Sequence, residues 1–240
     1  MITKTALLAA AGLALAATGL HAQNVRIGTE GAYAPFNFVN DDGTLAGYDI
    51  AVGNEVCKRA ELDCTWVKND WDSIIPNLVS GNYDAIMAGM SVTPDRKQAI
   101  AFSDPYFPPE PSAYVALSDD ADIGGVVAAQ TGTVQADHVA ESGATLIEFA
   151  TIDEGIAAVR KGEADAYFGD RAPLVPVVEQ GNDLVWVGET INLDEGLGIG
   201  LRQSDTELQE KVNAALASMK ADGTLNELIH QYFGEEANGF

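Results

Sequence analysis

The chain has 240 residues and carries 36 acidic against 13 basic side chains, which gives a formal net charge of −23. This acidity argues against binding to nucleic acid or to anionic membrane surfaces, because both would repel the chain. The two cysteines and three histidines show no spacing typical of a metal site, and no cofactor motif is present. The length is sufficient for two modest domains.

The first 22 residues have the pattern of a secretory signal peptide. Lys4 gives a short positive start, an apolar run covers residues 6–17, and small residues precede a cleavage site that we expect after Ala22. The apolar run is too short and too rich in alanine for a membrane-spanning helix. We therefore expect an exported protein.

Strand-like and helix-like segments alternate along the rest of the chain. The predicted strands are residues 24–29, 64–67, 84–88, 124–130, 145–150, 165–169, 183–188 and 195–202. The predicted helices are residues 49–59, 71–79, 133–140, 152–160 and 206–220, with a further helix start at 93–95. This alternation predicts an α/β protein with largely parallel sheets. The proline-rich residues 103–117 look like an extended connection.

The two cysteines follow each other within the first predicted helix–strand unit. On one continuous helix, Cys57 and Cys64 would lie roughly 10 Å apart, which is too far for a disulfide. A helix that ends near Ala60 and a strand that starts near Cys64 can bring them together. In an exported chain we expect a disulfide, with two free buried thiols as the alternative.

The chain repeats a helix–glycine–strand pattern in its two halves. Gly81 precedes Asp84 at the same spacing as Gly162 precedes Asp165, and in both cases Asp-Ala opens a strand. Two related lobes joined by two crossings explain the repeat, and a coincidence between common units is the alternative. The predicted division is residues 23–108 with 195–240 in lobe 1, and 109–194 in lobe 2. Hinged lobes usually close on a ligand.

Polar and aromatic residues gather directly after the predicted strands, where α/β sheets bind ligands. These candidates are Glu30, Tyr33, Trp71, Gly89, Ser91, Arg96, Thr133 and Asp170. One guanidinium, two carboxylates, hydroxyls and glycine backbone suit a zwitterion, because a carboxylate prefers a guanidinium and helix amides.

Arg96 is unusual in the first turn of a helix that begins at Thr93-Pro94. The helix dipole disfavours a cation there. A bound anionic ligand would explain Arg96, whereas the alternative is a solvated side chain paired with Asp95.

Four stretches carry a resemblance to a known family: "GTEGAYAPFNF", "GYDIAVGNEVCKRAELDCTWV", "DWDSIIPNLVSGNYDAIMAGMSVTPDRKQAIAFSDPYF" and "DGTLNELIHQYFG". They resemble the periplasmic amino-acid-binding proteins of ABC importers, including the cysteine pair of the lysine/arginine/ornithine and histidine binders. The resemblance implies a two-lobed, hinged fold of the type II kind, a periplasmic location, one amino-acid ligand and a membrane permease as partner. It implies no enzymatic activity, and we expect a monomer.

The resemblance also implies how the α-carboxylate and α-ammonium of the ligand are held. Arg96 resembles the carboxylate clamp, and its implied helpers are the backbone amides of Ser91 and Val134 and the Thr133 side chain. Asp170 resembles the acceptor of the α-ammonium, together with the Gly89 carbonyl and the Ser91 hydroxyl.

The ligand side chain is the least determined part. Tyr33 and Trp71 resemble the aromatic pair that sandwiches it, and Glu30 stands where basic-ligand members carry an acid. Ala88 and Gly89 replace serines that basic-amino-acid binders often have. We expect arginine first, then lysine, ornithine and histidine, with opines as outsiders. A neutral or acidic ligand such as glutamine or glutamate, and a dehydratase-like enzyme on the same fold, are the alternatives.

Overall fold

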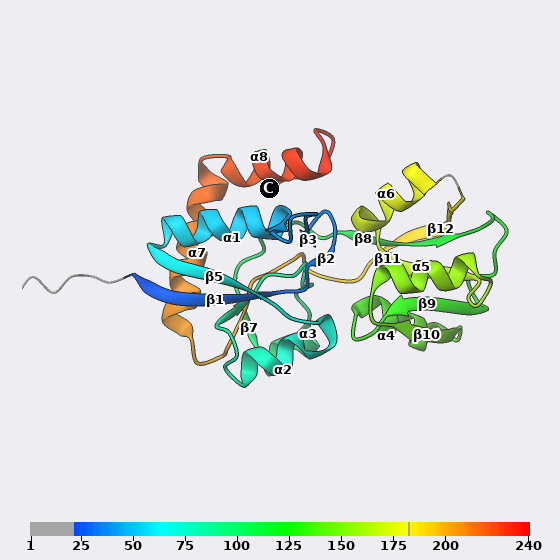
Figure 1. Cartoon of the computed structure of the whole chain (residues 1–240), viewed down its shortest axis with the longest axis horizontal. Helices are drawn as coiled ribbons and strands as arrows, with labels where there is room; N and C mark the ends of the chain where they lie inside the picture. The colour runs from blue at the N-terminus through cyan, green and yellow to red at the C-terminus, as the bar shows by residue number, and fades with distance from the viewer. Residues whose placement is uncertain (1–21, 182) are drawn as a thin grey trace, which may run out of the picture.

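Two five-stranded sheets organise the chain, one in each of two lobes that lie side by side in Figure 1. The computed structural model describes residues 22–181 and 183–240. The predicted signal peptide therefore lies outside the described residues, except for Ala22. Within the described part, no helix combines the length and the apolar character needed to cross a membrane.

The spatial order of the strands in each sheet differs from their order along the chain. From one edge to the other, the first sheet contains β5 (Leu62–Lys68), β1 (Gln23–Thr29), β6 (Ala85–Ile86), β13 (Gly200–Leu201) and β7 (Ala101–Phe102). The second contains β10 (Thr145–Phe149), β9 (Val126–Gln130), β11 (Ala166–Asp170), β8 (Pro111–Ala116) and β12 (Val185–Asn192). A small third sheet contains β2 (Ala32–Tyr33), β3 (Asn37–Val39) and β4 (Leu45–Ala46).

The helices connect these strands and cover both sheets. They are α1 (Tyr48–Arg59), α2 (Ile74–Val79), α3 (Pro94–Ala99), α4 (Val134–Ser142), α5 (Ile152–Arg160), α6 (Arg171–Gly181), α7 (Thr206–Ala221) and α8 (Thr224–Phe233), with a 3₁₀ turn at Trp71–Ser73. α1 packs against β5 and against α7 and α8, so the C-terminal helices belong with the first sheet (Figure 1).

Both sheets have the same topology. In each, the first strand of a βαβαβ unit lies between the second and the third and pairs in parallel with both, as β1 does with β5 and β6 and as β9 does with β10 and β11. An antiparallel strand then follows in each sheet, β13 beside β6 and β8 beside β11. The α/β prediction is confirmed, but the sheets are mixed rather than largely parallel.

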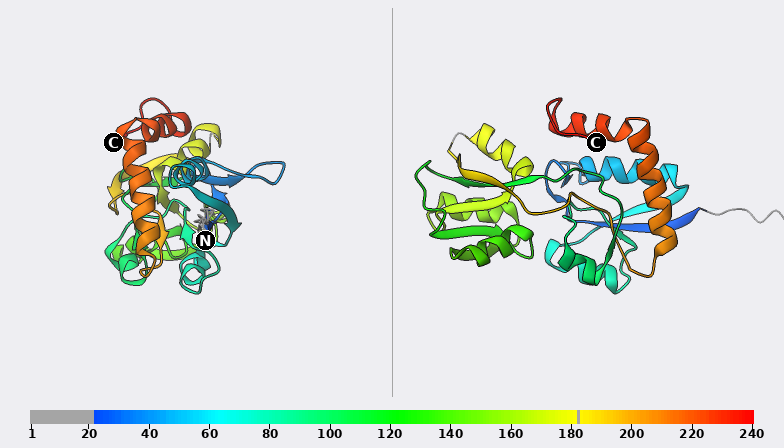
Figure 2. Two further views of the ribbon diagram at one scale, coloured as in Figure 1. Left: turned by 90° about the vertical axis from the view of Figure 1, so that its left-hand side faces the viewer. Right: turned by 180° about the vertical axis from the view of Figure 1, so that it is seen from behind.

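The antiparallel strands are those that arrive from the other lobe. The chain leaves the first sheet after β7 and enters the second at β8, and it returns between β12 and β13. The right-hand view of Figure 2 shows these two extended segments running between the lobes. A strand that enters from the opposite side can only pair antiparallel with β6 or β11, which explains the mixed sheets.

The sequence repeat corresponds to a repeated hydrogen-bond pattern. The Arg26 amide donates to the Asp84 carboxylate at 3.0 Å, and the Val126 amide donates to the Asp165 carboxylate at 2.8 Å. In both lobes the aspartate amide also donates back to the carbonyl of the same partner residue. These aspartates therefore fix the start of the third strand against the first.

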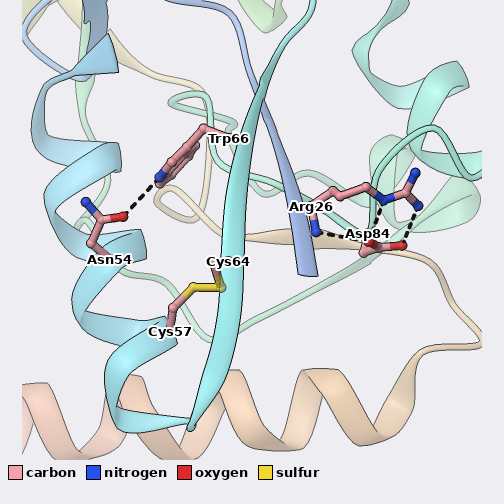
Figure 3. The surroundings of a disulfide bond; sticks show 6 residues. All are labelled: Arg26, Asn54, Cys57, Cys64, Trp66 and Asp84. Atoms are coloured by element: carbon pink, nitrogen blue, oxygen red, sulfur yellow. Dashed lines mark hydrogen bonds and ion pairs between the residues drawn. A yellow bond between two sulfur atoms is a disulfide. The ribbon is translucent and has the colours of Figure 1, made fainter. Parts of the chain in front are cut away.

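The predicted disulfide is confirmed. Cys57 and Cys64 are bonded, with their Cα atoms 6.2 Å apart (Figure 3). α1 ends at Arg59 and β5 begins at Leu62, so a turn between them brings the two sulfurs together. The bond joins the last turn of the helix to an edge strand of the first sheet.

Several elements differ from the sequence predictions. The expected strands at 84–88 and 195–202 shrink to β6 and β13, and the helix expected at 71–79 begins as a 3₁₀ turn. Residues 103–117, which we expected to be an extended connection, contain the strand β8. A strand is possible there because Pro111 stands at its first position and the residues that follow are buried. The small third sheet and α6 were not predicted, and Pro173 and Pro176 explain why the α6 sequence reads poorly as a helix.

Candidate functional site

A pocket lies between the two sheets. It is lined by Glu30, Tyr33, Trp71, Ala88, Gly89, Ser91, Arg96, Gln130, Thr133, Val134, Gln135 and Asp170. β9 and β11 end at residues of this wall, β1 ends directly before Glu30, and β6 ends two residues before Ala88. The pocket is therefore at the carboxyl ends of parallel strands, the edge where α/β sheets bind ligands.

The structure brings together all nine residues that the sequence singled out for this site. It adds Gln130 and Gln135, which the sequence reading missed, and Ala88, which had stood out only as a departure from the expected serine. Gln130 is the last residue of β9 and Gln135 lies in the first turn of α4. Neither directly follows a strand, so the pattern of strand ends did not single them out, although the helix start beside them was a usable signal.

Arg96 turns away from its helix and forms one wall of the pocket. Its Nη1 donates to the Ser91 carbonyl at 2.9 Å, and its Nη2 donates to the Gly132 carbonyl at 3.2 Å. The guanidinium carbon is 5.3 Å from the centroid of the Trp71 ring, a cation–π distance. The side chain thus reaches from the first sheet to a loop of the second, instead of pairing with Asp95 at the surface.

The N-terminus of α4 lies opposite Arg96 in the pocket wall. Thr133 caps this helix, since its hydroxyl accepts from the Ala136 amide at 3.2 Å and donates to the Gln130 carbonyl at 2.7 Å. Val134 is the first helical residue, and first-turn amides have no partner within a helix. A guanidinium and a helix N-terminus therefore face the same space, which suits a carboxylate.

Glu30 is buried, with only 4 % of its surface exposed. Its Oε1 accepts from Gln130 Nε2 at 2.7 Å, which links the end of β1 to the end of β9. Burial raises the pKa of Glu30 to about 7; the Gln130 hydrogen bond and Lys68 oppose this rise, and Asp70 adds to it. Glu30 is therefore a carboxyl group whose ionised form needs a cationic partner.

Asp170 is a second buried acid, at the end of β11. Its carboxylate accepts from the Tyr33 hydroxyl, from Gln135 Nε2 at 2.6 Å and from the Ser112 hydroxyl at 3.4 Å. Burial raises the pKa of Asp170 to about 6, the hydrogen bond from Tyr33 lowers it, and the charge of Asp194 raises it further. The three neutral donors orient the carboxylate without neutralising it.

The pocket floor explains one departure from the expected residues. Gly89 has a φ of +59°, and a Cβ atom there would lie 3.0 Å from two ring carbons of Tyr33. A serine at this position would combine backbone strain with a steric contact. Gly89 thus allows the aromatic ring of Tyr33 to lie directly against the backbone, at the cost of one hydroxyl donor.

The arrangement can hold a small zwitterion with a cationic side chain. The Arg96 guanidinium and the start of α4 attract an anion, and the carboxyl groups of Asp170 and Glu30 attract cations. In residues 22–181 and 183–240, no group of histidine, cysteine and acidic side chains is arranged to hold a metal ion.

Comparison with known proteins identifies the family. Residues 25–235 match the family model of the bacterial extracellular solute-binding proteins, family 3. The chain belongs to this family. The histidine-binding periplasmic protein of Escherichia coli K12 is 34 % identical, over 100 % of this chain and 98 % of its own. The lysine/arginine/ornithine-binding periplasmic protein of the same strain is 33 % identical, over 92 % and 93 %.

A solved structure resembles this family 3 chain more strongly. It is the periplasmic His/Glu/Gln/Arg/opine family-binding protein from Silicibacter pomeroyi in complex with lysine, with 60 % sequence identity and a TM-score of 0.89. The match covers 90 % of this chain and 100 % of that one. The resemblance to periplasmic amino-acid-binding proteins and the expected two-lobed type II fold are therefore confirmed, and these three relatives are binding proteins rather than enzymes.

Proposed function

We propose that this family 3 protein is the ligand-binding component of an ABC amino-acid importer and that it binds a basic L-amino acid, with arginine as the preferred ligand. The proposal assigns the α-carboxylate to Arg96, Thr133, the backbone amides of Ser91 and Val134, and the α-ammonium to Asp170, the Gly89 carbonyl and the Ser91 hydroxyl. It assigns the side chain to Tyr33, Trp71 and Glu30.

The observation that carries this proposal is a pair of buried carboxyl groups facing one pocket. Glu30 and Asp170 are 4 % and 6 % exposed, and burial raises both of their pKa values. Leaving two ionised carboxylates desolvated is costly. A ligand with two cationic groups stabilises both, and an α-ammonium together with a guanidinium or ε-ammonium supplies them.

The aromatic residues support the same ligand class. Tyr33 is 9 % exposed and stacks on Phe36 with 5.7 Å between ring centroids, so the ring is held in place. Trp71 lies over the Arg96 guanidinium at the other side of the pocket. Faces of two aromatic rings favour a flat cation such as a guanidinium by cation–π attraction. The names of the relatives, which include histidine, lysine and arginine binders, agree with this choice.

A dehydratase-like enzyme is the second candidate, favoured by one observation. A carboxyl group with a pKa raised to about 7 can donate a proton near neutral pH, and Glu30 meets that condition. The hydrogen bond that Glu30 accepts from Gln130 suits a cation binder better, because it stabilises the ionised carboxylate. Product formation distinguishes the candidates directly.

A thermal-shift screen of the mature chain tests the proposal. The ligands are arginine, lysine, ornithine, histidine, glutamine, glutamate and octopine, each at the same concentration, and bound ligand raises Tm by mass action. We expect arginine to give the largest rise. A larger rise with glutamine or glutamate would contradict the ligand assignment. Incubation with prephenate or arogenate, followed by product analysis, tests the enzymatic alternative, and we expect no product.

Membership of family 3 and the topology of the chain support further proposals on the location, the partner and the lobes of the protein. We propose a periplasmic protein, cleaved after Ala22, that acts as a monomer and delivers its ligand to an inner-membrane permease. We further propose that residues 23–108 and 195–240 move as one lobe and 109–194 as the other. The two crossings support that division, since within the described residues the chain passes between the sheets only from β7 to β8 and from β12 to β13.

A further inference from the structure

We infer that Asn37, anchored by Asp49, is a positioning residue for Glu30 and thereby controls how strongly the pocket prefers a cationic side chain. Neither residue lines the pocket. The inference rests on the proposed function, because it concerns the acid to which that function assigns the ligand's side-chain cation.

A buried hydrogen-bond network behind the pocket floor carries the inference. Asn37 Oδ1 accepts from the Gly31 amide at 2.7 Å, and Asn37 Nδ2 donates to Asp49 Oδ2 at 2.8 Å. Asp49 Oδ1 accepts from the Tyr106 hydroxyl at 2.7 Å. Asn37, Asp49 and Tyr106 are each 0 % exposed.

The network supports the backbone turn that carries Glu30. Gly31 directly follows Glu30 and has a φ of +74°. Turns of this kind lack the regular hydrogen bonds of strands, so their amides need other acceptors. The Asn37 side chain supplies that acceptor for the Gly31 amide. The backbone turn that places Glu30 beside Gln130 is therefore held by Asn37 through a buried hydrogen bond.

The orientation of the Asn37 amide is itself fixed by Asp49. An ionised carboxylate only accepts hydrogen bonds, so the Asn37 Nδ2 must face it and the Asn37 Oδ1 must face Gly31. Asp49 lies in the first turn of α1, where the helix dipole favours a negative charge. An apolar side chain at position 49 would leave the Asn37 amide free to turn over.

Tyr48 offers a matched control in the same part of the core. Its hydroxyl donates to the Tyr106 carbonyl at 2.6 Å, and it is 0 % exposed. It contacts neither Gly31 nor Gly89 by a hydrogen bond. Tyr48→Phe therefore removes a hydrogen bond that is as deeply buried as the one between Asn37 and Gly31, and it leaves the Asn37–Gly31 bond in place.

The experiment compares calorimetric affinities for arginine and for glutamine in five proteins. These are the wild type, Asn37→Ala, Asn37→Val, the exchange Asn37→Asp with Asp49→Asn, and Tyr48→Phe. Without an acceptor for the Gly31 amide, Glu30 should be misplaced and arginine should bind at least tenfold more weakly. This is about the value of the charged hydrogen bond between Glu30 and the ligand that would be lost. Glutamine should change less than about threefold, because its polar ends are held elsewhere and its side chain is neutral.

The exchange variant, Asn37→Asp with Asp49→Asn, should restore the hydrogen bonds that the single Asn37 variants lose. An aspartate at position 37 still accepts from Gly31, and an asparagine at 49 can donate to it while its oxygen accepts from Tyr106. We expect this variant and Tyr48→Phe to keep the wild-type ratio of the two affinities, even where Tm falls.

Two results would overturn the inference. One is an arginine-to-glutamine ratio in both Asn37→Ala and Asn37→Val within twofold of the wild type. If Asn37→Ala does not fold, the valine variant, which suits a β-strand and has no acceptor, decides alone. The other is equal weakening of both ligands, which would indicate a general structural role. A wild type that binds no basic amino acid would instead refute the proposed function, and the inference with it.

Discussion

Replacing Glu30 with glutamine removes one charge from the pocket and keeps the shape of the side chain. Glu30 Oε1 already accepts from Gln130 Nε2 at 2.7 Å, and a glutamine oxygen can accept the same bond. The variant should therefore fold normally. What it loses is the carboxylate that, in our proposal, binds the guanidinium of arginine.

The size of the effect follows from the burial of Glu30. At 4 % exposure, water does not replace a lost partner, so the change approaches the full value of a hydrogen bond to a charged group. That value is about 1.5–3 kcal/mol, or roughly a 10- to 150-fold rise in the Kd for arginine. Glutamine as ligand should bind equally well or better, since it gains nothing from the charge.

Calorimetry at pH 7.5 and pH 6.0 tests this prediction. The pKa of Glu30 is raised to about 7, and a cationic ligand favours the ionised form, so arginine binding to the wild type should weaken on acidification. Part of that pH dependence should be absent in Glu30→Gln. Glu148→Gln is the control, because it removes the same charge from an exposed position on β10. A change of less than about threefold for arginine, or equal weakening of glutamine, would refute the reasoning.

Four further predictions concern the clamp, the buried acids, the hinge and the disulfide. Arg96→Ala should weaken every amino-acid ligand by about 2–5 kcal/mol, roughly thirty- to several-thousand-fold in calorimetry, and unchanged affinity would place Arg96 outside the binding machinery. Burial raises the pKa values of Glu30 and Asp170 above their values in the unfolded chain, so folding takes up protons near neutral pH. The stability of the ligand-free protein should therefore rise as pH falls from about 7.5 to 5. A Tm that falls over this range in calorimetric scans would contradict this prediction. Saturating arginine should decrease the radius of gyration in small-angle scattering, and identical curves would argue against hinge closure. Reducing Cys57–Cys64 opens a short loop and should cost about 2 kcal/mol, a Tm drop of roughly 4–8 °C; an unchanged Tm in reductant would show that the bond contributes little.

Much of the site could be predicted because it depends on local chemistry. Strand ends in an α/β protein meet at one edge, so the residues after each predicted strand include Glu30 and Asp170 whatever the sheet order. The cap at Thr93 likewise marked the helix that carries Arg96, and the Arg96 amide donates to the Thr93 hydroxyl at 3.2 Å. The cysteine pair could be predicted from where α1 ends and β5 begins.

The parts that were missed depend on tertiary contacts. Asn37 lies in the short strand β3 and Asp49 in the first turn of α1. No sequence pattern around either residue shows that the two side chains meet behind the pocket. β8 reads as a connection because Pro108 and Pro109 precede it and Pro111 is its first residue, yet it pairs with β11 on one side and β12 on the other and is an internal strand. The direction in which β8 and β13 pair depends on the crossings between the lobes, which a one-dimensional pattern does not encode.

The central claim is that the pocket selects a ligand with an α-carboxylate, an α-ammonium and a second cation. The most direct measurement is a calorimetric titration of the mature protein at pH 7.5 with arginine, and then with citrulline, which has the same length but a neutral end group. We predict that arginine binds at least about tenfold more tightly than citrulline, because only arginine offers Glu30 a charged hydrogen bond. Equal affinities, or tighter binding of citrulline, would contradict the claim.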